Sequence, residues 1–324
     1  MVRKVQKKKS GIRMFAGLLL MVVITAFVYK AVITPENHQI FEKEYNDRTA
    51  LVHPPRIQPD PSVSISSDKL NSPNVILIRL NDYTVLMQKN SEEKIYPASL
   101  TKMMTAIAAI ENLPDLKEEI KLTNSTFQGL YGADASMAGF QPGEQVGAID
   151  LLYGVMLPSG AECCVALADQ IAGSERDFVK IMNRKAADLG MDNTHFENTT
   201  GLHNVNHYTT VKDLAVLLRY ALQNETFREI FTSSCHFTQP TNKHSGGITL
   251  NSTMFEELKH QNIINGEILG GKTGYTNEAG LCLASLAKVG KQEYILITAG
   301  AKGNPKSEKY NVTDALAVYN SLGE

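Results

Sequence analysis

The fold is decided by residues 271–300, which read GKTGYTNEAG LCLASLAKVG KQEYILITAG. Residues 271–275, 280–287 and 293–300 are rich in the β-branched, aromatic and aliphatic side chains that strands favour. Residues 288–291 hold a Gly between two Lys, which is typical of a turn. This stretch therefore predicts three strands near the carboxy-terminal end.

Two more strands are expected far upstream, over residues 75–80 and 83–88, joined by a hairpin turn at Asn81-Asp82. Between the two groups of strands the apolar residues recur at helical spacing. Strands at both ends with helices between them predict an α+β domain whose sheet is closed by distant parts of the chain. The predicted helices cover residues 99–113, 149–157, 161–171, 174–189 and 210–222, with a last one over 313–322.

The amino-terminal end has the pattern of a membrane anchor. Residues 1–13 hold six Lys or Arg and no acid, and residues 14–33 are apolar except for Lys30, which can extend to the interface. Twenty such residues suffice to span a bilayer as a helix, and the preceding basic residues predict a cytoplasmic amino terminus. A cleaved signal peptide is the alternative, although bulky Ile24 and Tyr29 stand where small residues precede a cleavage site.

The rest of the chain is divided by composition. Residues 34–68 are polar and contain five Pro, which predicts an extracytoplasmic tether, or alternatively an arm packed on the domain. Residues 69–324 form the predicted catalytic domain. The 324-residue chain has a formal net charge of −2, and residues 1–13 contribute +6 of it, so the other 311 residues carry −2 − 6 = −8 and the body is acidic. An acidic body disfavours nucleic acid as a partner.

A Ser-x-x-Lys pair can place a hydroxyl and an amine on one helical face, one turn apart. Such a lysine, when desolvated near a second cation, can be neutral enough to activate the serine. Only Ser99, which follows Tyr96-Pro97-Ala98, opens an apolar helix, so Ser99 and Lys102 are the preferred nucleophile and base. The four pairs in the chain are Ser66–Lys69, Ser91–Lys94, Ser99–Lys102 and Ser285–Lys288.

Two later motifs fit the same chemistry. Lys272 and Thr273, on a strand edge, can hold a carboxylate through a charge-assisted bond and a hydroxyl, and Gly274 lets a ligand backbone approach. Ser159 lies in a tight Pro-Ser-Gly loop between two predicted helices. Either motif alone is typical of an ordinary strand end or turn; their value lies in the order Ser-x-x-Lys, loop serine, Lys-Thr-Gly.

This ordered set resembles penicillin-binding proteins and serine β-lactamases. Five longer stretches resemble the low-molecular-mass D-alanyl-D-alanine carboxypeptidases in particular, and together they extend the resemblance over about residues 65–322. They are YPASLTK (96–102), SMAGFQPGE (136–144), LLYGVMLPSG (151–160), NTHFENTTGL (193–202) and GKTGYT (271–276).

The resemblance implies a transpeptidase-like fold, with an antiparallel sheet flanked by helices and a helical subdomain. Ser99 would be acylated, Lys102 would be its general base, and Ser159 would relay a proton. Lys272, Thr273 and Gly274 would bind a peptidoglycan stem peptide that ends in D-Ala-D-Ala. The oxyanion hole would be the backbone N–H groups of Ser99 and Tyr275.

The expected activity is that of a serine D,D-carboxypeptidase at the bacterial cell membrane, attached by one amino-terminal helix, with its catalytic domain outside the cytoplasm. β-Lactams would be acylating inhibitors. No metal or organic cofactor is implied. The four Cys are expected to be mostly buried small hydrophobic residues, and the scattered His form no metal motif, with His207 expected to be structural.

One departure from the family pattern concerns residue 161. The middle motif usually ends in Asn, whose amide can hold the catalytic lysine, and this chain has Ala161 followed by Glu162. We expect water or a neighbouring side chain to fill the amide's place, and Glu162 to point away. A non-catalytic sensor of β-lactams or cell wall remains an alternative, and so does a β-lactamase, although the chain shows no Glu-x-x-x-Asn segment in 174–200.

Overall fold

The computed structural model describes residues 66–259 and 261–323. By its internal contacts the chain divides into residues 1–54 and residues 55–324, and everything described belongs to the second unit. The predicted cytoplasmic segment and anchor, and the predicted tether up to residue 65, lie outside the described residues. Within the described part, every helix is too short or too polar to cross a bilayer.

A five-stranded sheet forms the centre of the domain, and every neighbouring pair of its strands is antiparallel. The first strand, β1, pairs with β9 from the far end of the chain, which confirms the predicted closure by distant segments. β7 is an edge strand. In spatial order the sheet consists of β2 (Thr84–Lys89), β1 (Asn74–Arg79), β9 (Gln292–Ala301), β8 (Gly280–Val289) and β7 (Gly266–Thr276).

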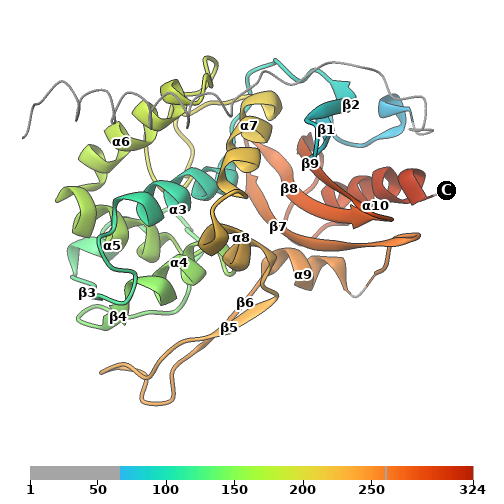
Figure 1. Ribbon diagram of the computed structural model, residues 1–324. Coiled ribbons are helices and arrows are strands. Elements are labelled where there is room, and N and C mark those ends of the chain that lie inside the picture. The colour runs from blue at the N-terminus through green and yellow to red at the C-terminus, as the bar shows by residue number, and fades with distance from the viewer. Residues whose placement is uncertain (1–65, 260, 324) are drawn as a thin grey trace, which may run out of the picture. The chain divides into compact units, whose positions relative to one another are not determined.

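The alternation of apolar residues along the strands separates two cores. Val75 and Leu77 belong to a smaller core under the last helix, whereas Ile76 and Ile78 belong to a larger core shared with the helical half. Successive strand residues point to opposite faces, so a strand with apolar residues at every position is buried on both. The helix α10 (Tyr310–Gly323) covers the face of the sheet that carries Val75 and Leu77 (Figure 1).

Most of the helices between β2 and β7 form the other half of the molecule (Figure 1), whereas the last of them, Thr253–Leu258, packs in the smaller core with α10. Two small antiparallel sheets of two strands each accompany them: β3 (Glu119–Lys121) with β4 (Gln145–Gly147), and β5 (Cys235–Phe237) with β6 (Thr249–Asn251). The helices are α3 (Thr101–Asn112), α4 (Ala148–Met156), α5 (Ala161–Ala172), α6 (Glu175–Asp188), α7 (Val211–Ala221), α8 (Glu225–Thr232) and α9 (Thr253–Leu258).

The structure corrects several boundaries. The first hairpin turn is wider than Asn81-Asp82, because Tyr83 adopts a left-handed conformation (φ 61°) before β2 begins. Ser99 does not open the long helix but lies in a short 3-10 helix, Ala98–Leu100, and α3 starts at Thr101. The last helix begins three residues early, at Tyr310, and β7 begins at Gly266. The helices α8 and α9 and both two-stranded sheets were not predicted.

Candidate active site

Ser99 lies on a turn that two other segments of the chain contact closely. Ala98, just before it, has a left-handed φ of 47°, which is costly for a residue with a Cβ. A Cβ on Gly201 would come within 1.9 Å of the Ala98 carbonyl oxygen, and one on Gly274 of β7 would lie 3.1 Å from the Ser99 nitrogen. Two glycines therefore allow the Gly201 loop and the edge strand to press against the Ser99 turn.

Lys102 is one helical turn beyond Ser99 and almost completely buried. Its Nζ lies 3.0 Å from Ser99 Oγ, and it donates to the carbonyl oxygen of Thr200 at 2.6 Å. Burial lowers the pKa of the Lys102 amine, because a charged ammonium loses its hydration there. A neutral amine at this distance from a hydroxyl can accept its proton.

The carbonyl that holds Lys102 belongs to a well-braced loop. Asn198 Oδ1 accepts the N–H of Gly201 at 2.7 Å and the Thr200 hydroxyl at 3.1 Å. Glu175 of α6 accepts both the N–H and the hydroxyl of Thr199, at 2.9 and 2.6 Å. A backbone carbonyl thus holds Lys102, whereas the group that fills the amide's place at residue 161 stays a prediction.

Ser159 is held in an unusual conformation with its hydroxyl unengaged. Its φ is 67°, and its buried Oγ has no hydrogen-bond partner among the described residues. The turn is tight, since the N–H of Gly160 donates to the Gly154 carbonyl at 2.8 Å. An unsatisfied buried hydroxyl costs free energy, so this geometry favours a site where an incoming group completes the bond.

Lys272 belongs to β7 and is buried, and its Nζ donates to the Thr273 carbonyl at 2.9 Å. Burial, and to a smaller extent the nearby charge of Lys102, lowers the pKa of Lys272 to about 7. The Thr273 hydroxyl lies 2.8 Å from the hydroxyl of Thr253, at the start of α9. An anion placed here would restore the charged form of Lys272.

These groups converge on a cavity of about 620 Å³. Ser99, Ser159, Thr273, Gly274 and Tyr275 line it, so the sequence-predicted serines and strand residues share one cavity. Lys102 and Lys272 are buried and do not belong to the lining. The lining also includes residues that sequence reasoning did not single out for a role. Examples are Asp134, Ser136, Thr253, Glu257 and Lys306.

The other Ser-x-x-Lys serines are engaged elsewhere. Ser66 accepts the N–H of Asp68, Ser91 donates to Gln88, and Ser285 is buried against Tyr319. In the described chain, Ser99 is the one of the four whose hydroxyl bonds the lysine three residues later.

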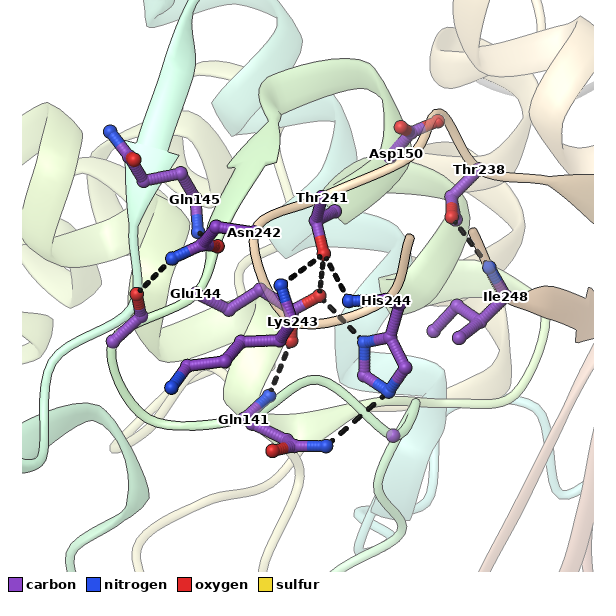
Figure 2. A network of polar contacts seen from close by, with 12 residues as sticks. Gln141, Glu144, Gln145, Asp150, Thr238, Thr241, Asn242, Lys243, His244 and Ile248 are labelled. Carbon is purple, nitrogen blue, oxygen red and sulfur yellow. Dashed lines mark hydrogen bonds and ion pairs between the residues drawn. The ribbon is translucent and has the colours of Figure 1, made fainter. Parts of the chain in front are cut away.

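A polar network stabilises the loop that follows Ser136 along the chain (Figure 2). Glu144, which is fully buried, accepts the N–H of Gln141 at 2.7 Å on Oε2. Its Oε1 accepts the Thr241 hydroxyl at 2.6 Å and lies 2.7 Å from Nδ1 of His244. The network ties this loop to the segment between β5 and β6.

The remaining Cys and His residues lie apart from the cavity lining. Cys163, Cys164 and Cys282 are buried, as expected, and Cys235 is exposed; all four are free thiols. His207 is buried 2.8 Å from the Thr101 hydroxyl, in a structural setting, and burial lowers its pKa to about 4. No group of His, Cys, Asp or Glu in the described ranges could hold a metal ion.

The domain has the fold of DD-peptidases of the penicillin-binding-protein and β-lactamase type, and it carries a buried Ser–Lys pair. The structure is similar to the Streptomyces K15 DD-transpeptidase, with TM-score 0.71 and 26% identity over 80% of this chain and 99% of that one. It is also similar to a D-alanyl-D-alanine carboxypeptidase from Mycobacterium tuberculosis, with TM-score 0.70 and 26% identity over 82% and 95%.

Sequence comparison narrows the class to a family. Residues 61–303 match the family model described as D-alanyl-D-alanine carboxypeptidase, and the chain belongs to this family. It is 35% identical to D-alanyl-D-alanine carboxypeptidase DacF of Bacillus subtilis, over 75% of this chain and 60% of that protein. It is 32% identical to DacC of Escherichia coli, over 69% and 56%. The chain therefore spans somewhat more than half the length of these curated relatives.

Proposed function

We propose that this protein is a serine D,D-carboxypeptidase that removes the terminal D-alanine from peptidoglycan stem peptides ending in D-Ala-D-Ala. The observation that carries the proposal is the buried Ser99–Lys102 pair, with 3.0 Å between hydroxyl and amine, at the wall of a cavity that also holds the unpartnered Ser159 hydroxyl. The family and the names of its relatives support the same activity.

Acylation uses groups already in place. Neutral Lys102 takes the Ser99 hydroxyl proton while Oγ attacks the carbonyl carbon of the penultimate D-alanine. The negative charge that develops on the carbonyl oxygen is accepted by the backbone N–H groups of Ser99 and Tyr275. The proton then passes through Ser159 to the nitrogen of the leaving D-alanine, the amide bond breaks, and an ester to Ser99 remains.

The edge strand β7 orients the substrate. The terminal carboxylate binds Lys272 and the Thr273 hydroxyl, and Gly274 lets the peptide backbone lie along β7. A carboxylate next to buried Lys272 favours its charged form, so substrate binding offsets the burial that lowers its pKa. Water, activated through Lys102, then hydrolyses the ester.

Transpeptidation is a second candidate activity, because the similar Streptomyces K15 structure is titled a DD-transpeptidase. The acyl ester is the same in both reactions. An amine from a second stem peptide would replace water as the attacking group, so the two activities differ only in the acceptor.

The proposed function includes attachment of the protein to the cell membrane. Basic residues 1–13 and the apolar run 14–33 support a single cytoplasm-to-outside membrane anchor, followed by a tether to the catalytic domain. Such an arrangement places the catalytic domain outside the cytoplasm, as a cell-wall enzyme requires. β-Lactams, whose strained amide mimics the scissile bond, would acylate Ser99 and block the site.

Mass spectrometry tests the proposal directly. The protein is incubated with a stem pentapeptide, with the pentapeptide plus an amine acceptor, and with a penicillin. We expect loss of one D-alanine, and a penicilloyl adduct on the peptide that holds Ser99. An adduct on Ser66, Ser91 or Ser285 would overturn the nucleophile assignment. Penicillin binding without D-alanine release would favour a sensor, and rapid penicillin turnover would favour a β-lactamase.

A further inference from the structure

Glu162 is a buried carboxylate that takes no part in the proposed acylation. It follows Ala161, where the family pattern is broken, and it lies on the first turn of α5 with 0% of its surface exposed. A fully buried Glu is rare unless its charge is paired or hydrogen-bonded. The burial of this carboxylate, three residues after Ser159, therefore needs a physical explanation.

The Glu162 carboxylate braces one wall of the cavity. Its Oε1 accepts the N–H groups of Ala138 and Gly139, at 2.7 and 2.9 Å. The segment carrying these N–H groups starts at Ser136, which lines the cavity and whose carbonyl accepts the N–H of Ala161 at 2.8 Å. Neighbouring residues 161 and 162 thus hold the same segment through three hydrogen bonds.

The braced segment in turn packs against the Ser159 turn. A Cβ on Gly160 would come within 2.7 Å of the Ala138 Cβ and 3.0 Å of its nitrogen, so the two pieces of backbone are in close contact. Movement of Ala138 would move the Ser159 turn. Glu162 is thereby linked to the position of the Ser159 hydroxyl without touching substrate.

Glu162 also brings negative charge to this pocket. Burial raises the pKa of the Glu162 carboxyl, and the two N–H donors limit this rise because they stabilise the ionised form. Its Oε2 has no partner in the described chain, so a carboxyl proton there would find no acceptor. Burial lowers the pKa of Lys102, and the charge of Glu162 opposes that shift.

Among the other titratable groups near Lys102 and Glu162, Glu175 is the one that carries the same kind of charge. Cys164 and Cys163 of α5 are neutral thiols, because burial raises the pKa of Cys164 to about 12 and that of Cys163 well above its usual range. Lys272 of β7 is a base and His207 a buried neutral imidazole. Glu175 of α6 is a second carboxylate, and it is hydrogen-bonded to Thr199.

We propose that Glu162 is a positioning residue for acylation: it fixes the Ser136–Phe140 segment against the Ser159 turn and supplies buried negative charge to the Ser99–Lys102 pocket. The inference rests on the proposed function. It gives a chain that lacks the family's Asn at residue 161 a different way to hold this side of the site, through the next residue along.

The test separates the charge from the brace. Glu162→Gln keeps an oxygen for the two N–H groups and removes the charge, whereas Glu162→Asp keeps the charge and shortens the side chain. Glu144→Gln is the matched control, since Glu144 is equally buried and also accepts a backbone N–H of the same loop (Figure 2). The rate of acylation by a fluorescent penicillin is measured from pH 5 to 9, with thermal unfolding to verify folding.

With less negative charge nearby, Lys102 loses its proton more easily. In the plot of acylation rate against pH, the acid limb of Glu162→Gln should therefore move to lower pH, by about half a pH unit or more. The acid limb of Glu144→Gln should stay at the wild-type position. Glu162→Asp should keep the wild-type limb and acylate roughly tenfold or more slowly, because the brace is lost.

Two results would overturn the inference in a wild-type protein that acylates normally: a Glu162→Gln limb that superimposes on wild type, or a Glu162→Asp rate equal to wild type. Should Glu162→Gln fail to fold, the Glu162→Asp rate and limb still decide the positioning role. A wild-type protein that neither binds penicillin nor releases D-alanine defeats the proposed function itself, and the inference with it.

Discussion

Replacement of Gly201 by Ala should damage both stability and acylation, by amounts that a second glycine calibrates. Gly201 has φ +82°, and an added Cβ would lie 1.9 Å from the Ala98 carbonyl oxygen and 3.0 Å from the Ser99 nitrogen. Gly190 has a similar φ of +71° but nothing within 4 Å of its added Cβ. The pair therefore separates backbone strain from steric collision.

Backbone strain alone costs an L-residue about 1–2 kcal/mol, which is the expected loss in the free energy of unfolding for Gly190→Ala. Gly201→Ala adds the cost of forcing apart two packed backbones, on the order of 1–3 kcal/mol, for a total of about 2–5 kcal/mol. Because the displaced backbone carries Ser99, a shift of about 1 Å should slow acylation on the order of 10²-fold.

Urea unfolding and the rate of penicillin acylation, measured on both variants, check this reasoning. Gly190→Ala should acylate at the wild-type rate. If Gly201→Ala matched Gly190→Ala in both stability and rate, the close approach of the Gly201 loop to the Ser99 turn would have no part in forming the site.

Three further outcomes are expected. Lys102→Ala and Ser159→Ala should each slow acylation by roughly 10² or more, since they break the proton path, whereas Ala161→Asn should change it by no more than about tenfold, one neutral hydrogen bond; stopped-flow measurement with a penicillin would reveal any reversal of this order. Burial lowers the pKa of Lys272 from 10.5 to about 7, so the unfolded state binds more protons between these values. Stability should accordingly rise with pH across that window and decline as pH falls toward 7, and the Lys272→Met variant should lose this component of the slope in urea titrations. A chain that begins near residue 60 should be soluble and active, because the motifs all lie beyond it; its recovery in the membrane fraction would require a second attachment.

Local pattern was sufficient for most of the fold. The helices α6 and α7 begin after Ser174 and Thr210, whose side chains accept N–H groups three residues on, as the sequence pattern predicts. The helix α8 has the same signal, since Asn224 accepts the N–H of Phe227, but only eight residues follow and their periodicity is short. Its end at Thr232 leaves little pattern to recognise.

The geometry of the site was beyond sequence reasoning for a different reason. Ala98 and Ser159 adopt left-handed backbone conformations that neither residue type favours, so tertiary packing must impose them. The Lys102–Thr200 contact joins residues 98 positions apart through a carbonyl, a group that every residue has. Composition and spacing cannot single out one carbonyl, whereas the identity of the serine and lysine residues was visible in the motifs.

The pairing of β1 with β9 has a consequence for the biogenesis of the protein. β1 ends at Arg79, and its partner β9 begins only at Gln292, so the central sheet stays incomplete until nearly the whole chain has been synthesised. Contacts of such long sequence separation form slowly, because the intervening loop must first be closed. The edge strand β7 belongs to the same late group of strands and approaches the Ser99 turn closely at Gly274, so the candidate site too is complete only once this end of the chain has been made.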